Sequence, residues 1–279
     1  MLHATANSNQ LWDVPVFATS ALVVATAVYV RGFRLARRTR KSELPIWRMW
    51  MFIAGIFVLF LALASPVDTF ADDLLLAHMT QHLLLMCVVP PLITLGAPVV
   101  PMLRGLPRVF VVHALGPSLR CSGFVRFWRM VRTPAIGWFA MNIAYLGWHI
   151  PAAYELALRS EAWHNVEHLC FLLTSLLFWW NVIEPWPNRR TLPRWAMLPY
   201  LLTADVVNTA VSAYLCFAGR VLYPSYGVER GILGLSPTAD QAAAGAEMWV
   251  IGSLAFLIPV AIITYGLTLH AGIPERATP

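Results

Sequence analysis

Residues 74–96, LLLAHMTQHLLLMCVVPPLITLG, form an apolar run that carries two histidines. A helix of about 20 such residues is long enough to cross the hydrocarbon core of a bilayer. His78 and His82 are four residues apart, so both imidazoles face one side of that helix, one turn apart. An ionisable side chain inside a membrane is costly and marks a functional site by default. The stretch therefore predicts a transmembrane helix that carries part of a binding site.

The rest of the chain has the composition of a membrane protein. Its 279 residues are 58% hydrophobic and only 12% charged, with a mean hydropathy of +0.63. That is too apolar for a soluble domain and is typical of a polytopic helical membrane protein. The four cysteines show no C-x-x-C spacing, which argues against a disulfide framework. We predict an all-α fold with a single domain over residues 1–279 and no soluble module.

Seven transmembrane spans can be drawn along the chain. They are residues 14–33, 46–65, 74–96, 134–153, 162–183, 196–218 and 247–270. Of the 20 Lys and Arg residues, 17 fall on one side of this arrangement and three on the other. The positive-inside rule then puts the N-terminus outside and the C-terminus in the cytoplasm. The net charge of +6 is thus a topology signal that favours contact with the lipid bilayer and not with nucleic acid.

This topology brings five histidines to one depth near the outer face of the membrane. The five are His78, His82, His149, His164 and His168. The pair His164 and His168 repeats the four-residue spacing, and His149 lies at the outer end of its span. An isolated interfacial histidine is more often a helix-packing residue, which stays an alternative for His149. Four buried imidazoles all need partners, however, so the two pairs predict a metal or cofactor site.

Copper is the ion we expect at this site. Imidazole suits copper, zinc, iron and nickel, and thioether ligands add a preference for Cu(I). Zinc is an alternative, and a haem held by His82 and His168 is another. Haem is less favoured because a porphyrin needs flat space between small residues, whereas 74–96 is rich in Leu and 162–183 in Leu, Phe and Trp.

Six further residues are candidates for auxiliary or orienting roles at the site. They are Gln81, Met86, Glu167, Asp240, Glu247 and Met248. Met86 continues the row of His78 and His82 on an ideal helix. A carboxylate or amide beside a ligating histidine can orient the imidazole.

Asp205 is a second intramembrane charge, near the middle of its span, with Asn208 about one turn further on. A proton or ion relay is one interpretation. A protonated carboxyl that forms a hydrogen bond between helices is the other. Both stay open. The connection 97–133 is rich in Arg and aromatic residues, and it predicts an amphipathic helix over 118–132 on the cytoplasmic membrane surface.

Four sets of residues follow the motif order of a known family, and the match to this family covers roughly residues 45–270. They are Ala77 to Leu85 with Pro90-Pro91-Leu92; Trp148-His149-Ile150-Pro151 with Tyr154; His164, Glu167-His168 and Phe178-Trp179-Trp180; and Leu222-Tyr223-Pro224 with Tyr226, Asp240-Gln241 and Met248-Trp249. In these motifs the chain resembles the polytopic cytochrome c oxidase assembly factor (CtaG) family.

The resemblance implies a multi-pass protein of the bacterial inner membrane that helps to mature a haem–copper cytochrome c oxidase by supporting copper delivery. Oxidase subunits or a periplasmic copper donor would be its partners, and it would not be an enzyme. Two residues depart from the family pattern. Glu247 stands where an apolar residue is expected, and Asp205 is not a hallmark of the family.

Three other functions stay open. An intramembrane zinc hydrolase would combine three His ligands and an activated water with a carboxylate base, here Glu167, Asp240 or Glu247. A copper transporter would continue the path inward through Asp205 and Asn208. A scaffold for assembly would hold no metal.

Overall fold

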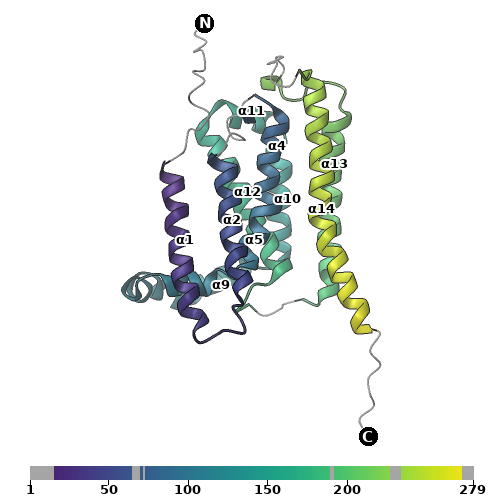
Figure 1. Ribbon diagram of the computed structural model, residues 1–279. Helices are drawn as coiled ribbons and strands as arrows, with labels where there is room; N and C mark the ends of the chain where they lie inside the picture. The colour runs from purple at the N-terminus through teal and green to yellow at the C-terminus, as the bar shows by residue number, and fades with distance from the viewer. Residues whose placement is uncertain (1–15, 65–69, 72, 189–191, 227–233, 272–279) are drawn as a thin grey trace.

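A computed structural model describes residues 16–64, 70–71, 73–188, 192–226 and 234–271, and every regular element within these ranges is a helix (Figure 1). The elements are α1 (Val16–Arg37), α2 (Ile46–Ala64), α4 (Leu75–Leu83), η1 (Leu84–Val88), α5 (Val89–Leu95), α6 (Val99–Gly105), α7 (Arg108–Phe110), η2 (Val111–Leu115), α8 (Gly116–Arg120), α9 (Ser122–Val131), α10 (Pro134–Trp148), α11 (Pro151–Arg159), α12 (Glu161–Ile183), η3 (Arg194–Ala196), α13 (Met197–Phe217), η4 (Pro224–Tyr226) and α14 (Pro237–Ala271).

Six helical stretches in the described ranges are long and apolar enough to cross a membrane. They are α1, α2, the run α4–η1–α5, α12, the run η3–α13, and α14. These match all the predicted spans except the fourth. The prediction of an all-α, multi-pass membrane protein is confirmed.

The predicted fourth span, 134–153, is wrong at its outer end. Helix α10 stops at Trp148, after 15 residues, and a separate helix, α11, starts at Pro151. The reason is local, because a proline has no N–H to donate and disfavours the helical conformation at the preceding residue. Ile150 is accordingly extended. By length alone a bent pair, Val99–Gly105 with Arg108–Ser118, is also a candidate for a seventh span.

The last helix, α14, begins at Pro237, ten residues before the predicted start at 247. Ser236 caps this end, since its hydroxyl accepts a hydrogen bond from the N–H of Ala239 at 3.3 Å. Asp240 and Gln241, which were expected just before the last span, therefore lie inside its helix.

The third span contains a π-helical turn, η1, that the apolar pattern did not predict. Its cause is the pair Pro90-Pro91, because neither residue can donate a backbone hydrogen bond to the preceding turn. The carbonyl of Met86 accepts a hydrogen bond from Nε1 of Trp179 on α12 instead, at 2.9 Å. This contact fixes α12 against the third span. The extra residue in the turn also breaks the ideal row that was predicted to run from His78 to Met86.

Glycines allow the helices around the core to approach closely. A Cβ atom at Gly245 would lie 2.6 Å from the backbone nitrogen of Cys216, so α13 and α14 pack directly against each other, as Figure 1 shows. Helix α4 packs on α14 from the other side, and α10 packs along α12. The largest buried cluster lies among these five helices.

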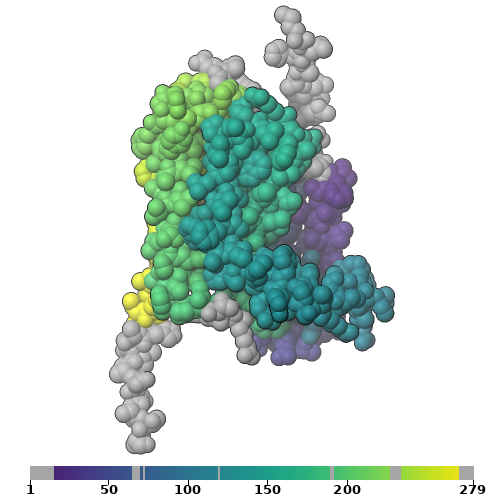
Figure 2. All heavy atoms as spheres, turned by 180° about the vertical axis from the view of Figure 1, so that it is seen from behind, coloured from purple at the N-terminus to yellow at the C-terminus, as the bar shows by residue number. Residues whose placement is uncertain are grey.

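The segment from α7 to α9 forms an arm that leaves the lower end of the bundle in Figure 1. Figure 2, the view from behind, shows the same arm projecting sideways from the lower part of the molecule. Helix α9 has no buried residue. The amphipathic helix predicted over 118–132 is thus present as Ser122–Val131, and the chain is extended at Cys121 before it.

Candidate metal centre

The two histidine pairs meet between α4 and α12. The ring centroids of His78 and His164 are 5.1 Å apart, and those of His82 and His168 are 5.5 Å apart. Because each pair is spaced by one helical turn, two neighbouring helices bring four imidazoles together. Their common depth in the membrane predicted that these histidines meet, and the structure brings these four together.

Two overlapping groups of side chains offer ligand atoms to one metal ion. The first is His78, His82 and His168, and the second is His78, His164 and Glu167. Within each group the ligand atoms lie within 4.8 Å of one another. Imidazole and carboxylate are ligands that copper and zinc share.

Glu167 is the most unusual member of the centre. Its side chain is fully buried, and neither carboxylate oxygen receives a hydrogen bond from any residue that the structure describes. Its Oε2 lies 3.8 Å from Nε2 of both His78 and His82. A buried carboxyl without donors either holds a proton and stays neutral or needs a nearby cation to offset its charge. Glu167 was predicted as an orienting group, and its position places it within reach of an ion.

The hydrogen bonds around His78 fix which of its nitrogens faces the centre. The hydroxyl of Tyr226 donates to the carbonyl of Ala71 at 2.6 Å. Its oxygen is therefore the acceptor in the 3.0 Å contact with Nδ1 of His78. The proton of His78 thus lies on Nδ1, and the lone pair of Nε2 points at His82 and Glu167. Sequence reasoning did not assign this role to Tyr226, although its motif was noted.

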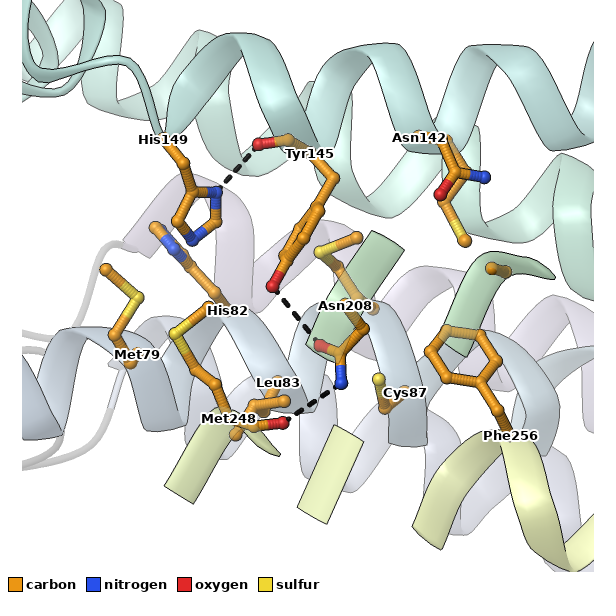
Figure 3. A pocket seen from close by; sticks show the side chains of 13 residues that line it. Met79, His82, Leu83, Cys87, Asn142, Tyr145, His149, Asn208, Met248 and Phe256 are labelled. Atoms are coloured by element: carbon orange, nitrogen blue, oxygen red, sulfur yellow. Dashed lines mark hydrogen bonds between the residues drawn. The ribbon is translucent and has the colours of Figure 1, made fainter. Parts of the chain in front are cut away.

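His149 is not part of either group. It caps the end of α10, and its Nδ1 donates to the carbonyl of Tyr145 at 2.7 Å. It lines a small cavity beside the centre together with His82, Met86 and Met248 (Figure 3). Four of the five histidines expected in one cluster therefore lie together, and His149 lies apart from them. The two candidate methionine ligands, Met86 and Met248, line the same cavity as His149.

Three of the remaining candidates hold the scaffold together. Gln81 donates to the carbonyl of Ala62 on α2 at 2.6 Å. The carboxylate of Asp240 accepts hydrogen bonds from the N–H groups of Leu75 and Leu76, at 2.8 and 3.1 Å, and so caps α4. Glu247 accepts a hydrogen bond from the hydroxyl of Thr80 at 2.8 Å. Asp240 thus caps α4 and Glu247 joins α14 to α4, and the auxiliary role predicted for the two residues at the metal centre stays a prediction.

The two residues of the predicted relay have different surroundings. Asn208 lines the cavity, where it accepts a hydrogen bond from the hydroxyl of Tyr145 at 3.2 Å and donates to the carbonyl of Met248 at 3.3 Å. Asp205 is half-buried, and its Oδ1 has no hydrogen-bond partner within the described part of the chain. The structure therefore does not join the two side chains into one path.

Comparison with known proteins agrees with the motif pattern. Residues 27–268 match the family described as cytochrome c oxidase caa3 assembly factor (Caa3_CtaG). Similar proteins include an uncharacterized protein of Mycobacterium leprae, 24% identical over 88% of this chain and 38% of its own length. An uncharacterized protein of Mycobacterium bovis is 23% identical over 91% of this chain and 39% of its own length. The chain thus spans about two fifths of these relatives. No solved structure matches it.

Proposed function

Because the chain belongs to the cytochrome c oxidase caa3 assembly factor family, we propose that it helps to assemble a haem–copper oxidase by holding copper in the His–Glu centre between α4 and α12. The observation that carries the proposal is the fully buried carboxylate of Glu167, which lacks hydrogen-bond donors among the described residues and lies beside two imidazoles. A bound cation would supply the missing partner.

The ligand set would draw on His78, His82, His164 and His168, with Glu167 completing it. Neutral imidazoles suit copper in either oxidation state, and the carboxylate lowers the cost of burying a positive ion. The close approach of the four rings favours a single small ion over a haem, because a macrocycle needs open space between the helices.

The proposed setting is a bacterial inner membrane, with the whole chain as one multi-pass domain. The distribution of Lys and Arg would put the centre near the outer face. There it could receive copper from a periplasmic donor and pass it to an oxidase subunit. His149 would have an auxiliary part, which its position in the neighbouring cavity supports.

An intramembrane zinc hydrolase is the alternative. Of the three carboxylates considered as a general base, Asp240 and Glu247 form hydrogen bonds elsewhere, so Glu167 remains. Membership in an assembly-factor family favours a role without catalysis. Hydrolysis of labelled lipid by the pure protein, abolished by His82→Ala, would favour the hydrolase.

The deciding experiment is elemental analysis of detergent-purified protein, comparing the wild type with His82→Ala/His168→Ala. His113→Ala is the matched control, since His113 is exposed on the arm. Near-stoichiometric copper in the wild type and the control, lost in the double variant, supports the proposal. Stoichiometric zinc in the wild type would favour the alternative of a zinc hydrolase. Absence of any metal after anaerobic Cu(I) loading would leave a scaffold.

A second readout tests the assembly role in cells. Cells that lack the protein are complemented with each variant, and the copper content and activity of the purified terminal oxidase are measured. The double variant should yield an oxidase deficient in copper, whereas the control should restore it. Full oxidase copper with the double variant would contradict the proposal.

A further inference from the structure

The cavity beside the His–Glu centre is rich in sulfur. It lies among α4, η1, α10, α13 and α14. The volume open to the centre of a water molecule is about 20 Å³, which is enough for one water molecule or one ion. Four methionines line it, Met79, Met86, Met141 and Met248. Leu is the more common filler of such a space, so four thioethers around a cavity of this size call for a chemical explanation.

The first nitrogen ligand in this cavity is Nε2 of His149. The carbonyl of Tyr145 can only accept a hydrogen bond, so the 2.7 Å contact puts the proton of His149 on Nδ1. Nε2 of the neutral ring then carries a lone pair. It has no hydrogen-bond partner in the described ranges, although the residue is more than nine-tenths buried.

The second is Nδ1 of His82. Since Nε2 of His78 carries a lone pair, the 2.9 Å contact between the two Nε2 atoms requires His82 to donate from its own Nε2. The lone pair of His82 is therefore on Nδ1. This atom is buried, and it too has no hydrogen-bond partner among the residues described. Figure 3 shows the rings of His82 and His149 at one end of the cavity, with the side chains of Met79 and Met248 beside them.

We propose that this cavity is a second metal site, which binds one soft monovalent cation, Cu(I), through His82, His149 and the thioethers of Met79 and Met248. Two imidazole nitrogens and two thioethers are soft or borderline ligands and select Cu(I) over harder ions. No carboxylate is among the lining residues that the structure describes. A monovalent ion therefore suits this site better than a divalent one, because an uncompensated buried charge is costly.

His82 connects this site with the His–Glu centre. Its Nε2 lies 3.8 Å from Oε2 of Glu167, and the residue also lines the cavity. A neutral imidazole has one lone pair and so binds one ion at a time. The two sites consequently share a ligand. A copper ion can change sites when the proton of His82 moves from one ring nitrogen to the other, because the nitrogen that loses the proton is the one that can bind copper. The existence of the second site does not depend on the oxidase-assembly proposal.

The test separates the two sites with variants. His164→Ala/His168→Ala removes ligands of the His–Glu centre and leaves His82 and His149 in place. Purified protein is loaded with Cu(I) without oxygen, and bound copper and its X-ray absorption spectrum are measured. This variant should retain about one Cu(I) with sulfur neighbours. Adding Met79→Leu/Met248→Leu nearly conserves volume and should weaken Cu(I) binding by more than the roughly 10–100-fold typical of outer-shell changes.

Met49→Leu/Met197→Leu in the same background is the control, because both methionines pack elsewhere in the molecule. It should keep the affinity and the sulfur signal. The proposal fails if Met79→Leu/Met248→Leu binds Cu(I) as tightly as this control. A sulfur-free Cu(I) environment in His164→Ala/His168→Ala, where the His–Glu centre no longer competes for His82, would also overturn it. Either result leaves the proposal of the His–Glu centre standing, because that proposal is tested by metal that is bound without sulfur ligands.

Discussion

At the scale of single residues, Glu167 is the side chain on which the proposed chemistry of the centre most depends. We expect Glu167→Gln to weaken metal binding and to reduce the thermal stabilisation that added copper gives, because a neutral amide does not offset the charge of a bound ion as a carboxylate does. Thermal unfolding with and without added copper measures both effects. The control is Glu161→Gln, an exposed carboxylate on the same helix, which should change neither. Unchanged copper binding by Glu167→Gln would remove the carboxylate from the ligand set.

The protonation of the imidazoles gives the centre a pH dependence. A ligating imidazole must be neutral, and the ordinary pKa of histidine is about 6.5. Protons compete with the metal for the ring nitrogens, so we expect occupancy to be full at neutral pH and to fall as the pH is lowered well below this ordinary value. Equilibrium dialysis across this range, followed by elemental analysis, measures the effect. Stoichiometric metal retained down to the lowest pH at which the protein stays folded would count against histidine ligation.

Residue spacing predicted part of the site well. The two four-residue pairs marked His78, His82, His164 and His168, because helix geometry alone puts each pair on one face. The partition of His149 into a separate cavity was not predictable, since it depends on the carbonyl that its Nδ1 contacts. The roles of Asp240 and Tyr226 depend in the same way on contacts between residues about 150 or more positions apart in the chain.

Glu155 matters at the scale of elements, because it anchors the turn η4 to α11. Its carboxylate accepts hydrogen bonds from the N–H and hydroxyl of Ser225, at 2.9 and 2.7 Å. Partial burial acts to raise its pKa, but the bonds from Ser225 and the nearby Arg159 leave the pKa of Glu155 below its ordinary value. Next to Ser225 in the turn is Tyr226, which orients His78.

We therefore expect Glu155→Ala to lower the free energy of unfolding by about 1–3 kcal/mol and to weaken metal binding through the loosened turn. Because the folded pKa is depressed, the contribution of the ionised group is complete above about pH 4.5, the ordinary value, and is lost as the pH falls through the folded pKa. Unfolding curves at pH 7 and at low pH measure it. Glu161→Ala should be neutral, and equal metal affinity in Glu155→Ala would separate the turn from the centre.

The ends of a helix could be predicted where the length of the apolar run sets them. The prediction failed where a proline or a capping residue sets them. The span at 162–183 agrees with Glu161–Ile183 within one residue, because the apolar run itself ends there. Pro151 ended α10 early, and the pair Pro90-Pro91 produced the π-turn. All three prolines are visible in the sequence, but the length of an apolar run does not reveal their effect.

At the scale of the whole molecule, α10 links the two ends of the bundle. It begins directly after the arm at the lower end in Figure 1 and leads to α11 at the upper end. Its 15 residues span only about 22 Å, less than the roughly 30 Å hydrocarbon core. A short span is accommodated when the bilayer thins locally or neighbouring helices shield it. The arm and the metal centre should then lie on opposite sides of the membrane.

Cys121 on the arm offers a native test of this topology. It is exposed, and hydrogen bonds from the backbone at Phe124 and Gly123 lower the pKa of its thiol, which favours reaction with a maleimide. In intact cells a membrane-impermeant maleimide should leave Cys121 unlabelled, and it should label Cys121 after permeabilisation. Arg220→Cys in a Cys121→Ser background should react in intact cells, because residue 220 is exposed on the connection that leads to η4. Labelling of Cys121 from outside would reverse the predicted orientation and put the metal centre on the cytoplasmic side, away from any periplasmic copper donor.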